Sequence, residues 1–164
     1  MATARKKALS IEAARKLMAN AQIGSIRLID ARVRHRLENG NVSKPEALNV
    51  GVTTKSEGVV DQQNNLRVRA QYSLVAKRTA DKAPAVDIRA SFELLYTIPP
   101  DLKPSDREIK AFSVTNAMLN SWPYFREFVQ SMIARMNLPP LTLPLYRILQ
   151  PKPTVEQRTS AKAS

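Results

Sequence analysis

The strongest constraint on this fold is a strict alternation of apolar and polar residues over 66–77, repeated over 86–98. Successive side chains of a strand point to opposite faces, so each run gathers its apolar residues on one face. Two such strands predict a sheet with one covered face and one face in water. The apolar members are Leu66, Val68, Ala70, Tyr72, Leu74 and Ala76, then Val86, Ile88, Ala90, Phe92, Leu94, Tyr96 and Ile98.

Two further runs complete the expected sheet over 25–98. Residues 25–37 alternate in part, and Leu48, Val50 and Val52 share one side of the next run. Turn signals at 39–41 and 62–65 separate the runs. Short turns between successive strands favour antiparallel pairing.

Helices that could cover the sheet follow it over 105–136. Ser105 and Glu108 form a capping-box pattern at the start. Pro123 lacks an amide hydrogen, so it should either kink the helix or begin a new one, which gives two helical segments broken near it. An apolar stripe at helical spacing should pack on the sheet: Phe125, Phe128, Val129, Met132, Ile133 and Met136. The expected class is α+β, with a four-stranded antiparallel, Greek-key-like sheet covered on one face by C-terminal helices.

The remaining segments surround this single domain, which we place at 10–149. Residues 1–9 are interpreted as a basic flexible arm, and 10–23 as an added N-terminal helix that Ser10 caps and Gly24 stops. The ribbon at 138–146 contains three prolines, so it cannot be a helix or a central strand. Residues 150–164 are interpreted as a flexible tail.

The sequence shows no recognisable set of catalytic or metal-binding residues. The chain has no cysteine and one histidine, His35, which leaves no ligand set for a tetrahedral metal site. Its four glycines lie far apart, so no phosphate loop is present. Asp87 and Glu93 share a strand face but would lie about 20 Å apart, too far for a glycosidase pair. We therefore expect no enzyme, no metal and no cofactor.

The formal net charge of +12 favours acidic partners. Arginines and lysines should lie on the open face of the sheet, at Arg67, Arg69, Lys77 and Arg89. A basic nucleic-acid-binding module is thus an alternative. Modules that bind single strands also use exposed aromatic side chains, and here Tyr72, Phe92 and Tyr96 alternate onto the covered side. No apolar run approaches the roughly 20 residues of a membrane span, and a cytoplasmic protein is the simplest reading.

Residues 111–143 resemble the distal helix region of the SecB family of protein-export chaperones. The motif is spread over a helix and its exit, and consists of Pro123, Tyr124, Arg126, Glu127, Ser131, Met132, Arg135 and Pro139, followed by Leu141 and Leu143. The four strands match that family in order and spacing, so the resemblance covers residues 25–146.

The resemblance implies an ATP-independent holdase that binds unfolded polypeptides for protein export, assembled as a homotetrameric dimer of dimers. Family members hold clients in long apolar grooves between sheet and helix-loop elements. The ribbon leucines either line this groove or pack as a plain edge. By position the groove residues would be Leu48, Val50, Val52, Trp122, Leu138, Leu141 and Leu143.

The charge of the open face departs from the family pattern. Export-dedicated relatives use acidic residues on that face to meet the SecA motor, whereas this chain has cations there. The basic charge therefore makes docking on SecA doubtful. A SecB-like chaperone dedicated to the antitoxin of a toxin–antitoxin pair fits the charge at least as well.

Overall fold

A computed structural model of the chain describes residues 2–36, 48–78 and 83–146, with only the backbone for residues 2–10. The predicted tail at 150–164 and the turn at 39–41 lie outside these ranges. In chain order the elements are α1 (Ala2–Asn20), β1 (Gln22–His35), β2 (Asn49–Val60), β3 (Asn65–Lys77), β4 (Val86–Thr97), α2 (Asp106–Phe112), the π-helix η1 (Ser113–Ala117) and α3 (Met118–Arg135). Strands precede the main helical segment, and the predicted α+β class is confirmed.

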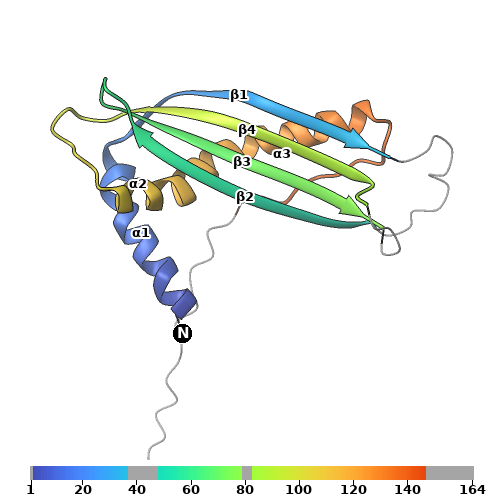
Figure 1. Cartoon of the computed structure of the whole chain (residues 1–164), viewed down its shortest axis with the longest axis horizontal. Helices are drawn as coiled ribbons and strands as arrows, with labels where there is room; N and C mark the ends of the chain where they lie inside the picture. Colours follow the sequence, from blue (N-terminus) through green and yellow to red (C-terminus); the bar gives the residue numbers. More distant parts are fainter. Residues whose placement is uncertain (1, 37–47, 79–82, 147–164) are drawn as a thin grey trace, which may run out of the picture.

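The strands form one antiparallel sheet in the order β1-β4-β3-β2 (Figure 1). β2, β3 and β4 pair in succession, whereas β1 pairs with β4 on the far side. Three successive strands with a fourth brought back beside them make the predicted Greek-key arrangement. β1 and β2 are consequently the edges of the sheet over the described residues.

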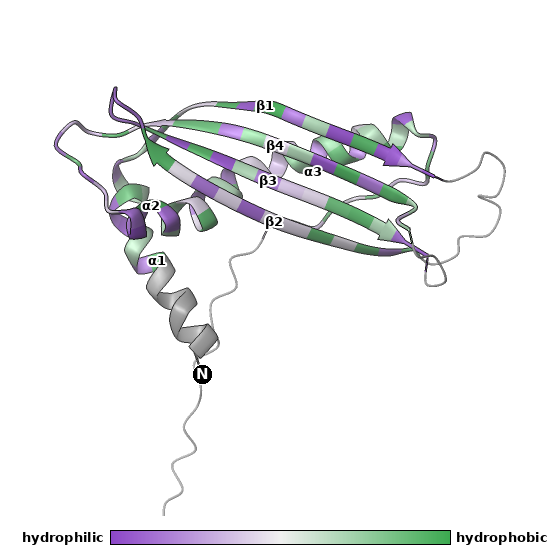
Figure 2. Cartoon of the chain, viewed as in Figure 1, coloured by the Kyte–Doolittle hydropathy of each residue, from purple (hydrophilic) through white to green (hydrophobic). Residues whose placement is uncertain are grey.

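The alternation divides the sheet into a core face and an open face. In β3 and β4 every second residue is buried, from Leu66 to Ala76 and from Val86 to Tyr96. The strands accordingly carry bands of contrasting hydropathy (Figure 2). The segment α2–η1–α3 lies against the core face, which leaves the open face to solvent (Figure 1).

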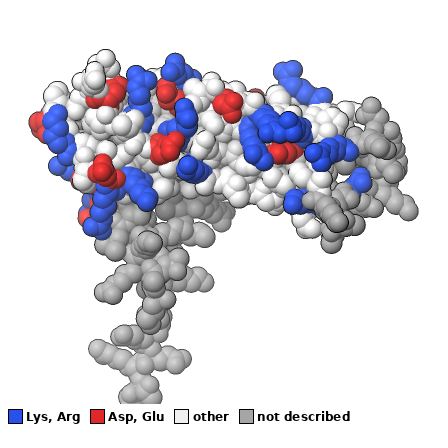
Figure 3. Space-filling model, viewed as in Figure 1, with Lys and Arg blue, Asp and Glu red and all other residues white. Residues whose placement is uncertain are grey.

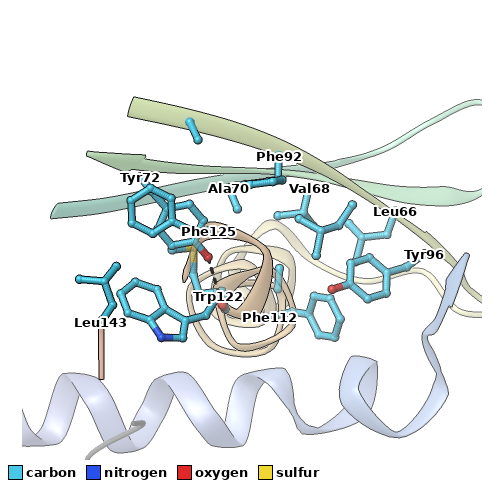
Figure 4. Close-up of a cluster of buried hydrophobic side chains, with 14 of the residues drawn as sticks. Leu66, Val68, Ala70, Tyr72, Phe92, Tyr96, Phe112, Trp122, Phe125 and Leu143 are labelled. Atoms are coloured by element: carbon cyan, nitrogen blue, oxygen red, sulfur yellow. Dashed lines mark hydrogen bonds between the residues drawn. The ribbon is translucent and has the colours of Figure 1, made fainter. Parts of the chain in front are cut away.

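Tyr72 joins the middle of the sheet to the helical segment. Its ring stacks on Phe125 with centroids 4.6 Å apart, and Phe92 meets it edge-on at 6.1 Å. Its hydroxyl lies 2.7 Å from Ser121 Oγ and donates to the carbonyl of Met118 at 3.1 Å (Figure 4). Burial raises the pKa of Tyr72, so the hydroxyl stays protonated at neutral pH. A buried aromatic with a satisfied hydroxyl fixes both the spacing and the register of the two layers.

The helical segment begins as predicted but is not broken where predicted. The Ser105 side chain caps the first turn, and the Glu108 carboxylate accepts a hydrogen bond from the Ser105 backbone at 2.8 Å. Pro123 lies inside α3, so the expected break near it is wrong. Its position is exposed, and water can satisfy the carbonyl that loses its amide partner there.

The irregularity in the helix lies upstream, in η1, where the chain passes under β2. An added Cβ at Gly58 would lie 2.6 Å from Ser113 Oγ and 2.9 Å from Ile109 Cγ2. The Ser113 hydroxyl donates to the Ile109 carbonyl at 2.8 Å, which holds it in this position. Gly58 therefore permits the close approach of the helical segment to β2.

The N-terminal boundaries differ from those predicted. α1 starts at Ala2, so residues 2–9 are helical instead of a loose arm, and it ends at Asn20. Gly24 lies within β1, not at a helix end, and the pairing with β4 shifts there and again at Ile29. Each bulge inserts one extra residue, so the side chains after it point to the opposite face from the one that strict alternation predicts. The bulge at Ile29 falls within residues 25–37, and this is why the alternation there is only partial.

We predict that Gly58→Ala destabilises the fold by about 1–3 kcal/mol, because the new methyl group overlaps atoms of the helical segment. Chemical denaturation followed by circular dichroism measures this. Gly51→Ala is the matched control, since a Cβ at Gly51 in the same strand meets nothing within 4 Å. Equal stability losses in the two variants would contradict the proposed close packing at Gly58.

Candidate functional site

The proline-rich ribbon at 138–146 packs beside the aromatic core. Leu143 is only 5% exposed and Trp122 is also buried (Figure 4). Leu138 and Leu141 are half-buried against the same core. Of the predicted groove residues, Leu143 and Trp122 are thus core residues in this conformation. Leu138 and Leu141 keep part of their surface open.

Two side chains of α3 hold the ribbon by its backbone. Trp122 Nε1 donates to the carbonyl of Pro144, and Arg126 Nε donates to the carbonyl of Leu143, both at 2.8 Å. The ring of Tyr146 lies 5.5 Å from that of Trp122. The ribbon forms no strand, as its prolines predicted. It is an extended segment fastened to an aromatic surface by side chains.

A left-handed residue sets the direction of the ribbon. Asn137 has φ 54°, and its amide donates to Ala134 while the amide of Leu138 donates to Ile133. This pair of bonds is a Schellman ending, and prolines commonly follow it. The sequence analysis missed Asn137, although asparagine before Leu-Pro-Pro is a usable signal for such an ending.

The other predicted groove residues lie at the free edge of β2. Val50 and Val52 point to the core face opposite Ala76 and Leu74. Val50 is nevertheless 41% exposed, and Leu48 just before the strand is also exposed. The segments α2 and η1 contact β2, with Gly58 at the close approach, which lies in the second half of the strand. Over the described residues no further strand pairs with the outer side of β2, so residues 50–54 offer a partly uncovered apolar side at a sheet edge.

The motif residues are divided between structural and exposed positions. Arg126 fastens the ribbon, and Arg135 Nε lies 3.5 Å from Ser131 Oγ, one turn away on the helix. Met132 is half-buried against the core. The others lie on the outside of the helix or the ribbon, namely Pro123, Tyr124, Glu127 and Pro139.

A second apolar strip lies at the opposite edge of the sheet, beside β1. Ile23 and Leu28 point to the core face, yet each is nearly half exposed. Tyr124 of α3 is 48% exposed, and its ring lies 6.4 Å from that of Phe92, which pairs with Leu28. One helix is too narrow to cover four strands, so both edges of the core face stay partly open. The sequence analysis did not single out this strip.

The predicted basic residues lie on the open face, and some are neutralised there. Arg67 bonds Asp61 at 3.0 Å, and Arg89 holds Asp87 through two bonds at 3.0 and 3.1 Å. The backbone amide of Asn65, followed by Arg67, lowers the pKa of Asp61. Arg69 and Lys77 are exposed.

The described part of the chain contains no group of three or more His, Asp or Glu that could hold a metal. Asp87 is engaged by Arg89, and Glu93 is engaged by Arg27 and Arg67. Within the same residues, no helix is long and apolar enough to cross a membrane.

Comparison with known proteins finds similarity to SecB-like chaperones. No family model matches the chain. The chain is 29% identical over 142 residues to "SecB-like chaperone Rv1957" and to "SecB-like chaperone MT2006", from two strains of Mycobacterium tuberculosis, covering 78% of each sequence. Among solved structures, Mycobacterium tuberculosis Rv1957 in complex with a ChAD peptide from the Rv1956 HigA1 antitoxin matches with a TM-score of 0.71 at 23% identity. That match covers 84% of this chain and 98% of Rv1957.

These matches cover most of the chain, 78% of it in sequence and 84% in structure. The structural likeness confirms the fold, and the sequence likeness reaches beyond the motif at 111–143. The predicted resemblance is confirmed: in sequence this chain is similar to the SecB-like chaperones, and it shares the fold of Rv1957.

Proposed function

We propose that the chain is an ATP-independent holdase chaperone whose polypeptide clients bind at the free edge of β2. The uncovered apolar side of that strand, at Leu48, Val50 and Val52, carries this proposal. A strand at a sheet edge has backbone groups free to pair with an extended client. Apolar client side chains would then enter the space between β2 and the helical layer.

The energetics suit clients of varied sequence. Main-chain pairing is independent of side-chain identity, and each buried leucine-sized side chain contributes about 1.5–3 kcal/mol before entropy losses. Several weak contacts along one client would together give useful affinity. Leu138 and Leu141 of the ribbon are the further apolar contacts we assign to this site.

Suppression of aggregation tests this function. Wild-type protein should keep a chemically unfolded client soluble without nucleotide, and added ATP should change nothing. Val50→Asp should weaken client binding about tenfold, because a charge would be buried against apolar client groups. Leu141→Asp should act in the same direction.

Val59→Asp is the matched control, because Val59 belongs to the same strand but lies on the open face, opposite Arg67, and is exposed. Leu143→Asp is unsuitable, since it would place a charge in the core. If wild-type protein fails to suppress aggregation, the holdase proposal falls. If Val59→Asp is as harmful as Val50→Asp, the assignment to the core-face side of β2 falls.

A dedicated antitoxin chaperone is the second candidate. The solved structure of Rv1957 holds an antitoxin peptide, which favours this role over general export. A dedicated protein should bind the HigA1 ChAD peptide at least about tenfold more tightly than unrelated unfolded chains of equal length. A general holdase should bind both within a few-fold. Fluorescence anisotropy with labelled peptides distinguishes the two.

We further propose a homo-oligomer, with the strip of Ile23, Leu28 and Tyr124 as an interface between copies. An edge strand with adjoining exposed apolar side chains can pair with its own symmetry mate. Leu28→Asp should lower the mass measured by light scattering, whereas Val59→Asp should leave it unchanged. A wild-type monomer at micromolar concentration would exclude this assembly.

A further inference from the structure

The open face of the sheet carries a shallow polar hollow that the proposed function does not use. It has a volume of about 290 Å³ and crosses all four strands, from Asp30 in β1 to Lys55 in β2. Hydroxyl and amide side chains from the middle strands line it, among them Gln71, Ser73 and Ser91. These groups donate as well as accept hydrogen bonds, so a ligand rich in oxygen acceptors can bind them when cations lie beside the hollow.

Two arginines face each other beside this hollow. Arg32 of β1 lies directly opposite Arg89 of β4, and Arg89 also lines the hollow. Like charges directly opposite each other destabilise a sheet. Asp87 compensates Arg89 through two hydrogen bonds, whereas Arg32 has no acidic partner among the described residues. An anionic ligand would supply the missing charge.

The charge surplus is confined to this half of the open face. In the other half the cations are balanced by acids in alternating cross-strand order, with Glu57 opposite Arg69, Arg69 opposite Glu93 and Glu93 opposite Arg27. Around the hollow the cations outnumber the acids, and Figure 3, which looks onto this face, shows blue with little red toward that end. The cations there are Arg32, Arg34, Lys55, Lys77 and Arg89, against Asp30 and Asp87; Lys55 also lies 3.9 Å from Glu57 of the balanced half but stays exposed.

We propose that the hollow and its cationic surroundings form a docking site for an acidic segment of a partner protein. Partner carboxylates would bind Arg32, Lys55 and the N–H groups of Arg89 that do not bond Asp87. The hydroxyl groups of the hollow would donate hydrogen bonds to the carboxylate oxygens that these cations leave free. Asp30 at the β1 end directs the carboxylates toward Arg89 and β2 by repulsion. This surface is on the opposite side of the sheet from the client edge, so both could be occupied together.

A protein partner fits this face better than a nucleic acid. Side chains that point outward from the described strands on this side include no aromatic residue, because Tyr72, Phe92 and Tyr96 are buried on the core face. Single-stranded nucleic acids are held by stacking on aromatic side chains as well as by charge. Carboxylates need only the cations and hydroxyls that are present.

The test uses the full chain and three labelled probes of equal length in fluorescence anisotropy. These are a Glu-Ser repeat peptide, a Lys-Ser repeat peptide and oligo(dT). The Glu-Ser peptide should bind most tightly, and binding should weaken as salt increases. Arg32→Gln should weaken it about tenfold, whereas the matched variant Arg69→Gln, which removes one cation from the balanced half, should change it less than about twofold.

Three outcomes would overturn the proposal. If Arg69→Gln and Arg32→Gln weaken binding equally, the peptide is attracted by net charge alone. If oligo(dT) binds more tightly and displaces the peptide, the partner is a nucleic acid. Ser73→Leu tests the hollow without changing charge, and unaltered affinity in that variant would also exclude the site. Thermal unfolding of each variant verifies that the fold is intact, and client binding should be unaffected throughout.

Discussion

The architecture depends on the fit of one helical segment against the middle of a four-stranded sheet. Tyr72 is at the centre of that fit, because it stacks on Phe125 and bonds the backbone of α3 from the sheet. Gly58 allows the same segment to pass close under β2 at one end. Phe92, which meets Tyr72 edge-on, pairs with Leu28 and lies 6.4 Å from Tyr124, so the central packing continues into the apolar strip beside β1.

The position of the helical segment decides which surfaces remain for recognition. A layer one helix wide covers β3 and β4 and leaves apolar residues of β1 and β2 partly exposed. Among the described residues, those exposed side chains lie beside strand edges with no further neighbour, and this combination favours pairing with another chain. The polypeptide binding proposed above would thus follow from incomplete coverage of the sheet.

The sequence predicted the parts of the fold that local chemistry determines. Alternation identified β3 and β4, and the Ser105–Glu108 pattern identified the start of the helical segment. The prediction failed where tertiary contacts override local preference. Pro123 lies inside α3 instead of breaking it, and Gly24 lies at a β-bulge instead of at the end of a helix. The site was predictable only in outline. Whether Leu143 is buried depends on how the ribbon folds back, and periodicity carries no information on that.

The fastening of the ribbon has a consequence for divergence among such proteins. Trp122 and Arg126 grip carbonyl oxygens, and every amino acid has one. Substitutions at the outward positions of residues 138–146 therefore leave the attachment intact. Two related proteins could therefore differ in the outer surface of this short stretch alone, while sheet and helix remain unaltered.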